Sequence, residues 1–430
     1  MSHDIRELAE LPVRRLERMP GLLRLLIPIF LVVGLIALIG AFVSDPARAW
    51  RAYHFNWLYF TTLAQGAVIL AVVVTITRGL WSRPVRRIAL SFVAFMPIAF
   101  VLMLPILFFG TESIFPWVAD PSTMQKGKEA YLNVPFMSVR TIVLLGALIA
   151  FDLAFAYWSL RPDLGRLRDS VDQRLRGLYS KLSKDWRGVE EEELRSYRKI
   201  AKLGPLTAAV WAIAFGVIAW DFIMSLEPHW FSTMIGPYFF MTGFLSGIAA
   251  TGLICALYVL RNNQGDVLHA TTFHDIGKLT FGFCVFWAYL FYSQFIVIWY
   301  GMLPVEQAWI NHRFGMPFQP FMIAVFFCLF VLPFFGLLSA TPKKRPQLYA
   351  IFASIVLIGV WLERFMLVYP SHYARAEQVP FGWPEIGIAL FFAGLLLSAI
   401  MWFQTRFPLY QLWQPVSEIE LLGVEEPQAA

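Results

Sequence analysis

The chain has 430 residues, of which 58% are hydrophobic and only 15% are charged. A soluble globular protein cannot keep so apolar a chain in water, so this composition excludes an ordinary soluble domain and indicates an integral membrane protein. The formal net charge is +6, and the Lys and Arg residues lie mainly between the apolar segments. Membrane topology explains such a distribution, so the charge does not indicate a nucleic-acid partner.

Ten apolar stretches are long enough to cross about 30 Å of hydrocarbon as α-helices. They lie near residues 21–43, 55–77, 87–109, 137–160, 206–226, 236–260, 279–300, 318–340, 347–368 and 385–404. The first stretch follows Arg14, Arg15 and Arg18 and has no small-residue cleavage site, so we expect it to be retained. The sequence predicts an all-α, polytopic membrane protein with ten transmembrane helices.

The distribution of Lys and Arg predicts which side each loop faces. Basic residues are frequent in the N-terminal tail, the 78–87 loop, the 161–205 loop and the turn at 343–345. The opposite set of loops carries few, namely Arg48, Arg51, Lys126, Lys128, Arg313 and Arg375. Because basic residues are retained on the cytoplasmic side, both termini are expected in the cytoplasm.

The 161–205 loop is the longest segment between the spans. Its apolar residues recur at helical spacing among Arg and Lys, which predicts a basic amphipathic helix on the inner leaflet or on a partner. These residues are Leu164, Leu167, Val171, Leu175, Leu178, Leu182 and Trp186. Acidic residues at 190–193 and basic residues at 198–202 predict a second short helix. A solvated charged hairpin is the alternative.

The order of the spans indicates an internal repeat. Spans 2 to 5 and spans 6 to 9 each contain four helices and start on the same side, which predicts two four-helix bundles with spans 1 and 10 beside them. Aligning the two sets pairs Asp221 with Glu363 and Gly66 with Gly247. The predicted units are the N-terminal tail and first helix at 1–54, the first bundle with its cytoplasmic loop at 55–226, the second bundle at 227–368, and the tenth helix with a cytoplasmic tail at 369–430.

The sequence offers no ligand set for a redox cofactor. The histidines fall in tails, loops or span ends, so a haem held by two histidines on facing helices is not expected. Cys255, Cys284 and Cys328 each stand alone in an apolar helix and form neither a haem attachment motif nor an iron–sulfur ligand set. No metal and no cofactor are predicted in this chain.

A few ionisable residues fall inside the predicted spans, among them Arg140, Asp152, Asp221, Glu363 and Arg364. Inserting a charged side chain at the bilayer centre costs about 2.5–3.5 kcal/mol of free energy. The residue is tolerated when it pairs with an opposite charge, faces a cavity or becomes neutral by gaining or losing a proton. These residues are candidates for function, above all the repeat mates Asp221 and Glu363. Because Arg364 is turned about 100° from Glu363 around the helix, Arg140 is an alternative partner for either acid. The alternative role is structural, as hydrogen bonds between helices.

Three stretches resemble a known family. They are WDFIMSLEPHWFSTMIGPYFF at 220–240, FHDIGKLTFGFCVFWAYLFYSQFIVIWYGMLPVE at 273–306 and ERF at 363–365. They resemble the NrfD-like membrane subunits of bacterial alternative complex III, and among these the ActF type. The resemblance covers essentially the whole chain and implies a location in the bacterial cytoplasmic (inner) membrane.

The resemblance also implies a reaction and partners. Alternative complex III is a quinol:electron-acceptor oxidoreductase, so menaquinol or another quinol is the implied substrate of the complex. Its electrons pass through iron–sulfur clusters and c-type haems on partner subunits, whereas the NrfD-like subunits hold no redox centre. The implied partners are the paralogous NrfD-like subunit ActC, the iron–sulfur subunit ActB, the c-type cytochrome subunits ActA and ActE, small membrane subunits and membrane lipids.

An ActF-type subunit is implied to support assembly and a proton path, and it is not expected to be catalytic alone. A proton path would use the buried ionisable residues above, with His274 and Lys278 at the inner mouth of span 7 and Tyr289 and Tyr292 along it. Hydrogen bonds between helices are the alternative role of these tyrosines.

A quinol site is the second candidate. Quinol oxidation near the outer face would need a proton acceptor and aromatic walls, for which the sequence offers His54, Trp57, Glu227 and His229. A secondary transporter and a purely structural membrane anchor are the alternative functions.

Overall fold

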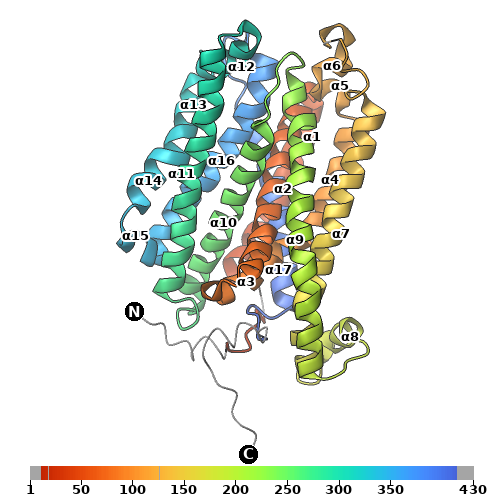
Figure 1. Ribbon diagram of the computed structural model, residues 1–430, viewed down its shortest axis with the longest axis vertical. Coiled ribbons are helices and arrows are strands. Elements are labelled where there is room, and N and C mark those ends of the chain that lie inside the picture. Colours follow the sequence, from red (N-terminus) through yellow and green to blue (C-terminus); the bar gives the residue numbers. More distant parts are fainter. Residues whose placement is uncertain (1–10, 18, 125, 414–430) are drawn as a thin grey trace, which may run out of the picture.

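The computed structural model describes residues 11–17, 19–124 and 126–413 (Figure 1). In these ranges every regular element is a helix, and ten helices are long and apolar enough to cross a membrane. The predicted all-α fold with ten spans is confirmed. The predicted tails extend to residues 1–10 and 414–430, which lie outside the described residues.

The spans are numbered in chain order with the short helices between them. The spans are α1 (Gly21–Ser44), α2 (Pro46–Ile76), α3 to α4 (Arg83–Phe108), α7 (Val134–Leu167), α9 with η4 (Val189–Leu226), α10 (Ile235–Asn262), α11 (Ala270–Gly301), α13 to α14 (Gln319–Leu337), α16 (Pro346–Tyr373) and α17 (Trp383–Arg406). The short helices are η1 (Leu80–Ser82), α5 (Thr111–Ile114), α6 (Pro116–Ala119), η3 (Pro121–Thr123), α8 (Gln173–Leu182), α12 (Pro304–Phe314) and α15 (Ala340–Lys344).

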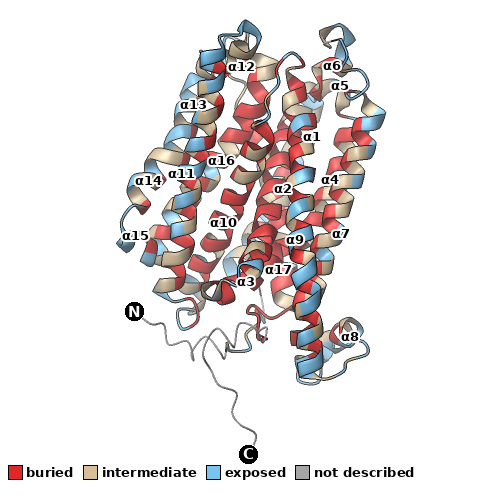
Figure 2. Ribbon diagram, in the orientation of Figure 1, coloured by how far each residue is buried: buried red, intermediate tan, exposed pale blue. Residues whose placement is uncertain are grey.

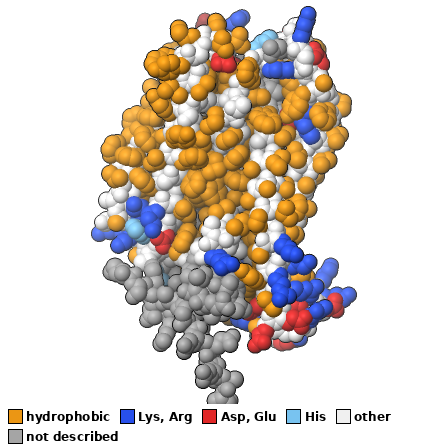
Figure 3. Space-filling view, viewed as in Figure 1, with side chains coloured by type: hydrophobic (Ala, Val, Ile, Leu, Met, Phe, Trp, Pro, Cys, Tyr) orange, Lys and Arg blue, Asp and Glu red, His pale blue; other side chains and the backbone are white. Residues whose placement is uncertain are grey.

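Figure 1 shows an elongated bundle with α5, α6 and α12 at one end, which we call the α12 end, and α8 at the other, which we call the α8 end. In Figure 3 apolar side chains cover the middle of the visible face, and more Lys and Arg side chains lie at the α8 end than at the α12 end. The two ends of the described chain lie at the α8 end too, where the Leu409 amide donates to the Arg14 carbonyl over 2.8 Å and the Tyr179 hydroxyl donates to the Arg406 carbonyl over 2.9 Å. That this end faces the cytoplasm stays a prediction.

Helices α2 and α10 cross at the centre of the bundle, in its most buried part (Figure 2). Glycines permit the close approach: a Cβ on Gly66 would lie 2.1 Å from the Gly243 carbonyl oxygen, and a Cβ on Gly247 would lie 2.2 Å from the carbonyl carbon of Gly66. Such distances leave no room for a methyl group. Gly66 and Gly247, which the predicted repeat pairs, therefore meet each other at this crossing.

The other spans pack around this central pair. On one side α2 contacts α4 and α9, and α7 packs against α9. On the other side α10 contacts α11 and α16, and α11 packs against α14. The first and last spans, α1 and α17, pack against each other, and a Cβ on Gly387 would meet the Ala37 Cβ at 2.2 Å. These contacts agree with two four-helix bundles and two flanking helices.

Two of the predicted unit boundaries fall inside helices. The boundary between 54 and 55 lies within α2, which begins at Pro46 because the Asp45 carboxylate caps the helix by accepting from the Arg48 amide over 3.0 Å. The boundary between 368 and 369 lies within α16, which continues to Tyr373. Hydropathy locates the apolar middle of a span, and polar residues at its ends conceal the full helix length.

The predicted single amphipathic helix over 164–186 is wrong. Helix α7 extends to Leu167, a turn follows, and α8 covers only Gln173–Leu182. The apolar side of α8 packs on the protein itself, since Tyr179 is 1% exposed and Leu178 packs against the core. The predicted second short helix continues through Pro205 into the next span as one helix, α9.

Candidate functional site

Asp152 lies near the middle of α7 and is fully buried. Its Oδ1 accepts a hydrogen bond from the Gln65 side-chain amide over 3.1 Å, whereas its Oδ2 has no hydrogen-bond partner among the described residues. A buried carboxyl without a cation beside it is far more stable with its proton bound than as an anion. Asp152 can therefore hold a proton in the middle of the membrane.

A row of polar side chains runs along one face of α2 from Asp152 toward the α12 end. His54, Thr61 and Gln65 are spaced by whole helical turns and cover about 16 Å of the helix. All three are at most 2% exposed. Both ring nitrogens of His54, Oγ1 of Thr61 and Oε1 of Gln65 lack a hydrogen-bond partner in the part of the chain that the structure describes. Buried polar atoms of this kind are costly unless protons or water reach them.

His54 ends this row inside a cluster of aromatic rings. Its ring centroid lies 6.0 Å from that of Phe115 and 5.7 Å from that of Phe222. Trp57 lies about one turn after His54 in α2, and its ring centroid is 5.3 Å from that of Phe222. Its Nε1–H donates to the Ala99 carbonyl over 2.8 Å. The structure thus brings together His54 and Trp57, two of the predicted quinol residues, within closely packed side chains.

A cavity of about 110 Å³ lies between Asp152 and the α8 end. It is lined by Thr75, Ile76, Arg78, Phe155, Ser159, Tyr197, Ile200, Ala201, Gln411 and Trp413. This volume accommodates several water molecules, and the hydroxyl, amide and guanidinium groups of the lining can bind them. Because Phe155 is less than one turn of α7 from Asp152, the cavity ends about 5 Å along the helix from that residue.

Asp221, the acid in the last turn of α9 at the α12 end, is paired. Arg140 of α7 donates to both of its carboxylate oxygens, over 2.7 and 2.6 Å, and also to the Tyr131 carbonyl over 2.8 Å. The guanidinium carbon of Arg140 lies 3.7 Å from the centre of the Tyr131 ring. A two-point pair of this kind fixes α7 against α9 and satisfies the charge of both partners.

Glu363 is also paired, and its partner is the next residue in the chain. Nη1 of Arg364 donates to Oε2 of Glu363 over 2.8 Å, and the Trp287 indole donates to Oε1 over 2.9 Å. Nη2 of Arg364 donates to the Phe239 carbonyl over 2.9 Å, which ties α16 to α10. Of the two partners left open by the sequence, Arg364 is therefore the one that Glu363 meets, although the two residues are turned about 100° apart around the helix.

Glu227 follows η4 at the α12 end. Its Oε1 accepts from Arg313 over 2.9 Å and from the Ser371 hydroxyl over 2.7 Å, and His312 Nδ1 lies 3.6 Å from its Oε2. Burial by itself raises the pKa of the Glu227 carboxyl, but the Arg313 charge and these hydrogen bonds outweigh burial and lower the pKa to about 2. Glu227 is therefore a fixed anion that anchors α12. His229, in the same predicted quinol set, is exposed.

The structure places four predicted path residues at the surface of α11. Tyr289 and Tyr292 are 60% and 58% exposed, so they face out of the bundle and do not line an interior path. Lys278 is exposed and its Nζ lies 2.7 Å from the Asp275 carboxylate, while His274 is half-buried beside the same acid. Because α11 is apolar around most of its circumference, its sequence did not reveal which face is buried.

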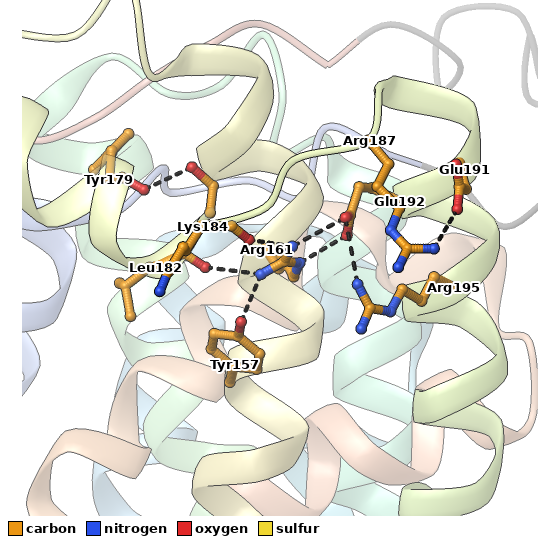
Figure 4. Close-up of polar contacts among 10 residues, drawn as sticks. Tyr157, Arg161, Tyr179, Leu182, Lys184, Arg187, Glu191, Glu192 and Arg195 are labelled. Atoms are coloured by element: carbon orange, nitrogen blue, oxygen red, sulfur yellow. Dashed lines mark hydrogen bonds and ion pairs between the residues drawn. The ribbon is translucent and has the colours of Figure 1, made fainter.

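Two buried ion pairs at the α8 end were missed from the sequence. In the first, drawn in Figure 4, Arg161 donates to both carboxylate oxygens of Glu192, over 2.7 and 2.9 Å, and to the Lys184 carbonyl over 2.8 Å. This pair joins α7 to the start of α9 and so holds two walls of the cavity together. In the second, Arg87 of α3 donates to Asp163 of α7 over 2.7 Å.

Both pairs fall in segments that the hydropathy pattern assigned to a loop or a span end. The helical spacing of Asp152, Ser159 and Asp163 along one face of α7 is the signal that could have revealed the second pair. No sequence signal identifies Arg87 as its partner, because that contact depends on how α3 packs against α7.

One known protein family matches most of the chain. The family model described as polysulphide reductase, NrfD, matches residues 42–376, which include α2 to α16. No curated protein matches the chain. Subunits of this family lack redox centres and work in complexes with iron–sulfur and other subunits. Among the described residues, no group of three or more His, Cys, Asp or Glu is placed to hold a metal ion. The chain belongs to the NrfD family and is a multi-pass membrane subunit of the quinol-oxidising respiratory complexes in which that family works.

Proposed function

We propose that this chain is the ActF-type NrfD subunit of an alternative complex III and that it moves protons through its first bundle. In this proposal it assembles with the paralogous subunit ActC, the iron–sulfur subunit ActB and the c-type cytochromes ActA and ActE, which carry the electrons from the quinol. The observation that carries the proton role is Asp152, a fully buried acid with an unpartnered oxygen between a polar row and a cavity.

The path has three parts. Water in the cavity brings a proton from the α8 end to within about one helical turn of Asp152. The protonated Asp152 carboxyl releases its proton from Oδ2 to a bridging water on the Thr61 side. Water from the cavity then protonates Oδ2 again, so the residue returns to its starting state. Thr61 and His54 then carry the proton toward the α12 end, because a hydroxyl and an imidazole can each accept a proton on one side and donate one on the other.

Gln65 has a different role in this path. A side-chain amide does not exchange protons readily, so its bond to Oδ1 of Asp152 orients the carboxyl and leaves Oδ2 for the proton. The intervals of about 6 and 10 Å between the polar side chains of α2 exceed hydrogen-bond length and require bridging water.

The other buried acids receive a structural role in this proposal. Asp221 is held by Arg140 and Glu363 by Arg364, with both oxygens of each carboxylate bonded. A carboxylate that is satisfied by a cation has no tendency to take up a passing proton. Quinol binding in this chain receives less support, since His54 and Trp57 are fully enclosed and Glu227 is neutralised by Arg313.

The decisive experiment compares Asp152→Asn with the parent protein in the purified complex reconstituted into liposomes. Quinol turnover and proton release are measured together, with Asp169→Asn as the matched control because Asp169 is 89% exposed. We expect normal subunit composition, proton release reduced by about tenfold in Asp152→Asn and unchanged release in the control.

Other outcomes would favour other functions. Full proton release by an assembled Asp152→Asn complex would reject the proton role and leave a structural anchor. Substrate-dependent uptake by this chain alone in liposomes would favour a secondary transporter.

A further inference from the structure

The polar row along α2 stops at His54, and a fixed cation follows it. Arg51 lies about one turn closer to the α12 end on the same helix. Its Nε donates to the Ser113 carbonyl over 3.2 Å, and its guanidinium carbon lies 5.0 Å from the centre of the Tyr373 ring. A guanidinium keeps its charge in proteins and has no site that accepts a proton. A proton that reaches His54 therefore needs a carrier on another helix.

His372 of α16 lies beside His54. On α2 the residue next to His54, Phe55, packs against Tyr369 of α16 with ring centroids 5.7 Å apart. About one turn toward the α12 end, α2 meets α16 again in the cation–π contact of Arg51. These two contacts bring the last turn of α16 against His54, and His372 is close enough to interact with His54 electrostatically.

His372 joins the enclosed interior to the surface. Of its two ring nitrogens only Nε2 is both buried and without a hydrogen-bond partner among the described residues, and the residue as a whole is half-buried. His54 is fully buried, and both of its ring nitrogens lack a partner within the same ranges. Unpartnered polar atoms in the interior are costly unless protons or water reach them. The two rings together form a polar link between the end of the row and the surface.

Opposite charges act on His372. The hydroxyl of the neighbouring residue Ser371 donates to Oε1 of Glu227 over 2.7 Å, which holds that carboxylate beside the last turn of α16. His372 interacts electrostatically with both Glu227 and Arg51. A carboxylate stabilises an imidazolium ion near it, whereas a guanidinium destabilises one. A proton carrier needs both influences, because it must bind a proton and release it again.

We propose that His372 is the exit residue of the proton path and passes protons from His54 to water at the α12 end. This inference rests on the proposed proton role of Asp152. The neutral ring accepts a proton at Nε2 and becomes an imidazolium ion, which then releases a proton from its other nitrogen to water. The ring is left neutral with Nε2 protonated, and a turn about its Cβ–Cγ bond restores the starting arrangement. Because His54 lies on α2 and His372 on α16, protons leave between the two bundles.

The first test compares two replacements of the same shape, His372→Gln and His372→Glu, in the full complex reconstituted into liposomes. Proton release is measured during quinol turnover. We expect normal subunit composition and about tenfold lower release in His372→Gln, because an amide does not exchange protons readily. His372→Glu restores a group that binds and releases protons, so it should release at least about threefold more than His372→Gln. The matched control is His229→Gln, which removes an exposed histidine at the same end and should leave release unchanged.

A second measurement needs no substitution at residue 372. Diethyl pyrocarbonate modifies accessible histidine rings, and hydroxylamine removes the modification. In the His229→Gln complex, release should fall in proportion to the modification of His372 and not of His312, as followed by mass spectrometry. Hydroxylamine should restore release. Full release with His372 modified would reject the exit even if the variants at this position did not assemble.

The outcomes separate the exit from the path. If His372→Gln assembles and releases protons at the parent rate, or releases as much as His372→Glu, His372 is not the exit. Reduced release in Asp152→Asn alone would then keep the proposed proton function. If Asp152→Asn releases protons normally while His372→Gln is impaired and His372→Glu recovers release, protons reach His372 by another route. In that case the exit stands and the proposed path through Asp152 fails.

Discussion

The roles assigned to the buried acids predict opposite effects for two conservative substitutions, Asp221→Asn and Asp152→Asn. Breaking a buried ion pair by removing one partner costs about 3–5 kcal/mol. In Asp221→Asn the remaining Arg140 is 10% exposed and keeps the Tyr131 carbonyl at 2.8 Å and the Tyr131 ring at 3.7 Å. A cation–π contact contributes about 0.5–1 kcal/mol or more. We therefore expect a net loss of about 2–4 kcal/mol in unfolding free energy.

In Asp152→Asn no cation among the described residues loses its partner. The new side chain has nearly the same volume and keeps a carbonyl oxygen to accept from Gln65, so we expect a stability change within about 1 kcal/mol. Proton release should nevertheless fall, because an amide cannot bind and release a proton at this site. The two substitutions thus separate stability from proton movement.

The assay is detergent-titrated unfolding of each purified variant, measured beside proton release at fixed quinol turnover. The double variant Asp221→Asn with Arg140→Gln is the control, since removing both charges should recover part of the lost stability. A stable Asp221→Asn variant with impaired proton release would refute the assignment and make Asp221 the proton carrier. A destabilised Asp152→Asn variant would mean that Asp152 is structural.

Three further predictions concern packing, pH and the surface of α11. Gly66→Ala should prevent assembly because its Cβ would lie 2.1 Å from a backbone oxygen, whereas Gly282→Ala, with nothing within 4 Å, should stabilise the purified complex by about 0.5–1 kcal/mol. The pKa of Glu227 is lowered from 4.5 to about 2, so its contribution to stability should be complete above about pH 4.5 and lost as pH falls toward 2. Glu227→Gln should remove that loss from acid unfolding curves. Replacing Tyr289 and Tyr292 by Phe should leave proton release unchanged and alter stability by less than about 0.5 kcal/mol, and reduced release would return them to the path.

The ten spans and the all-α class could be predicted from the amino-acid sequence alone. Both depend on local hydropathy, since each apolar stretch must satisfy its own backbone hydrogen bonds as a helix in lipid. The prediction that this chain has no redox ligand set also depended on local features, because haem and cluster ligands are recognised by residue type and spacing. The predicted repeat pairs Gly66 with Gly247, and the close crossing of α2 and α10 explains why both residues are small.

Which buried acids are paired could not be predicted without the packing of the helices. Asp152 and Asp221 look alike in the sequence, each a single acid in an apolar helix. Asp221 nevertheless pairs with Arg140, whereas the hydrogen-bond partner of Asp152 among the described residues is Gln65. The difference depends on how α7 is rotated against α9 and α2, which no local pattern fixes. The contact of Asp163 with the Leu412 and Trp413 amides could not be predicted either, because it joins segments that lie far apart in the chain and meet only after the spans have packed.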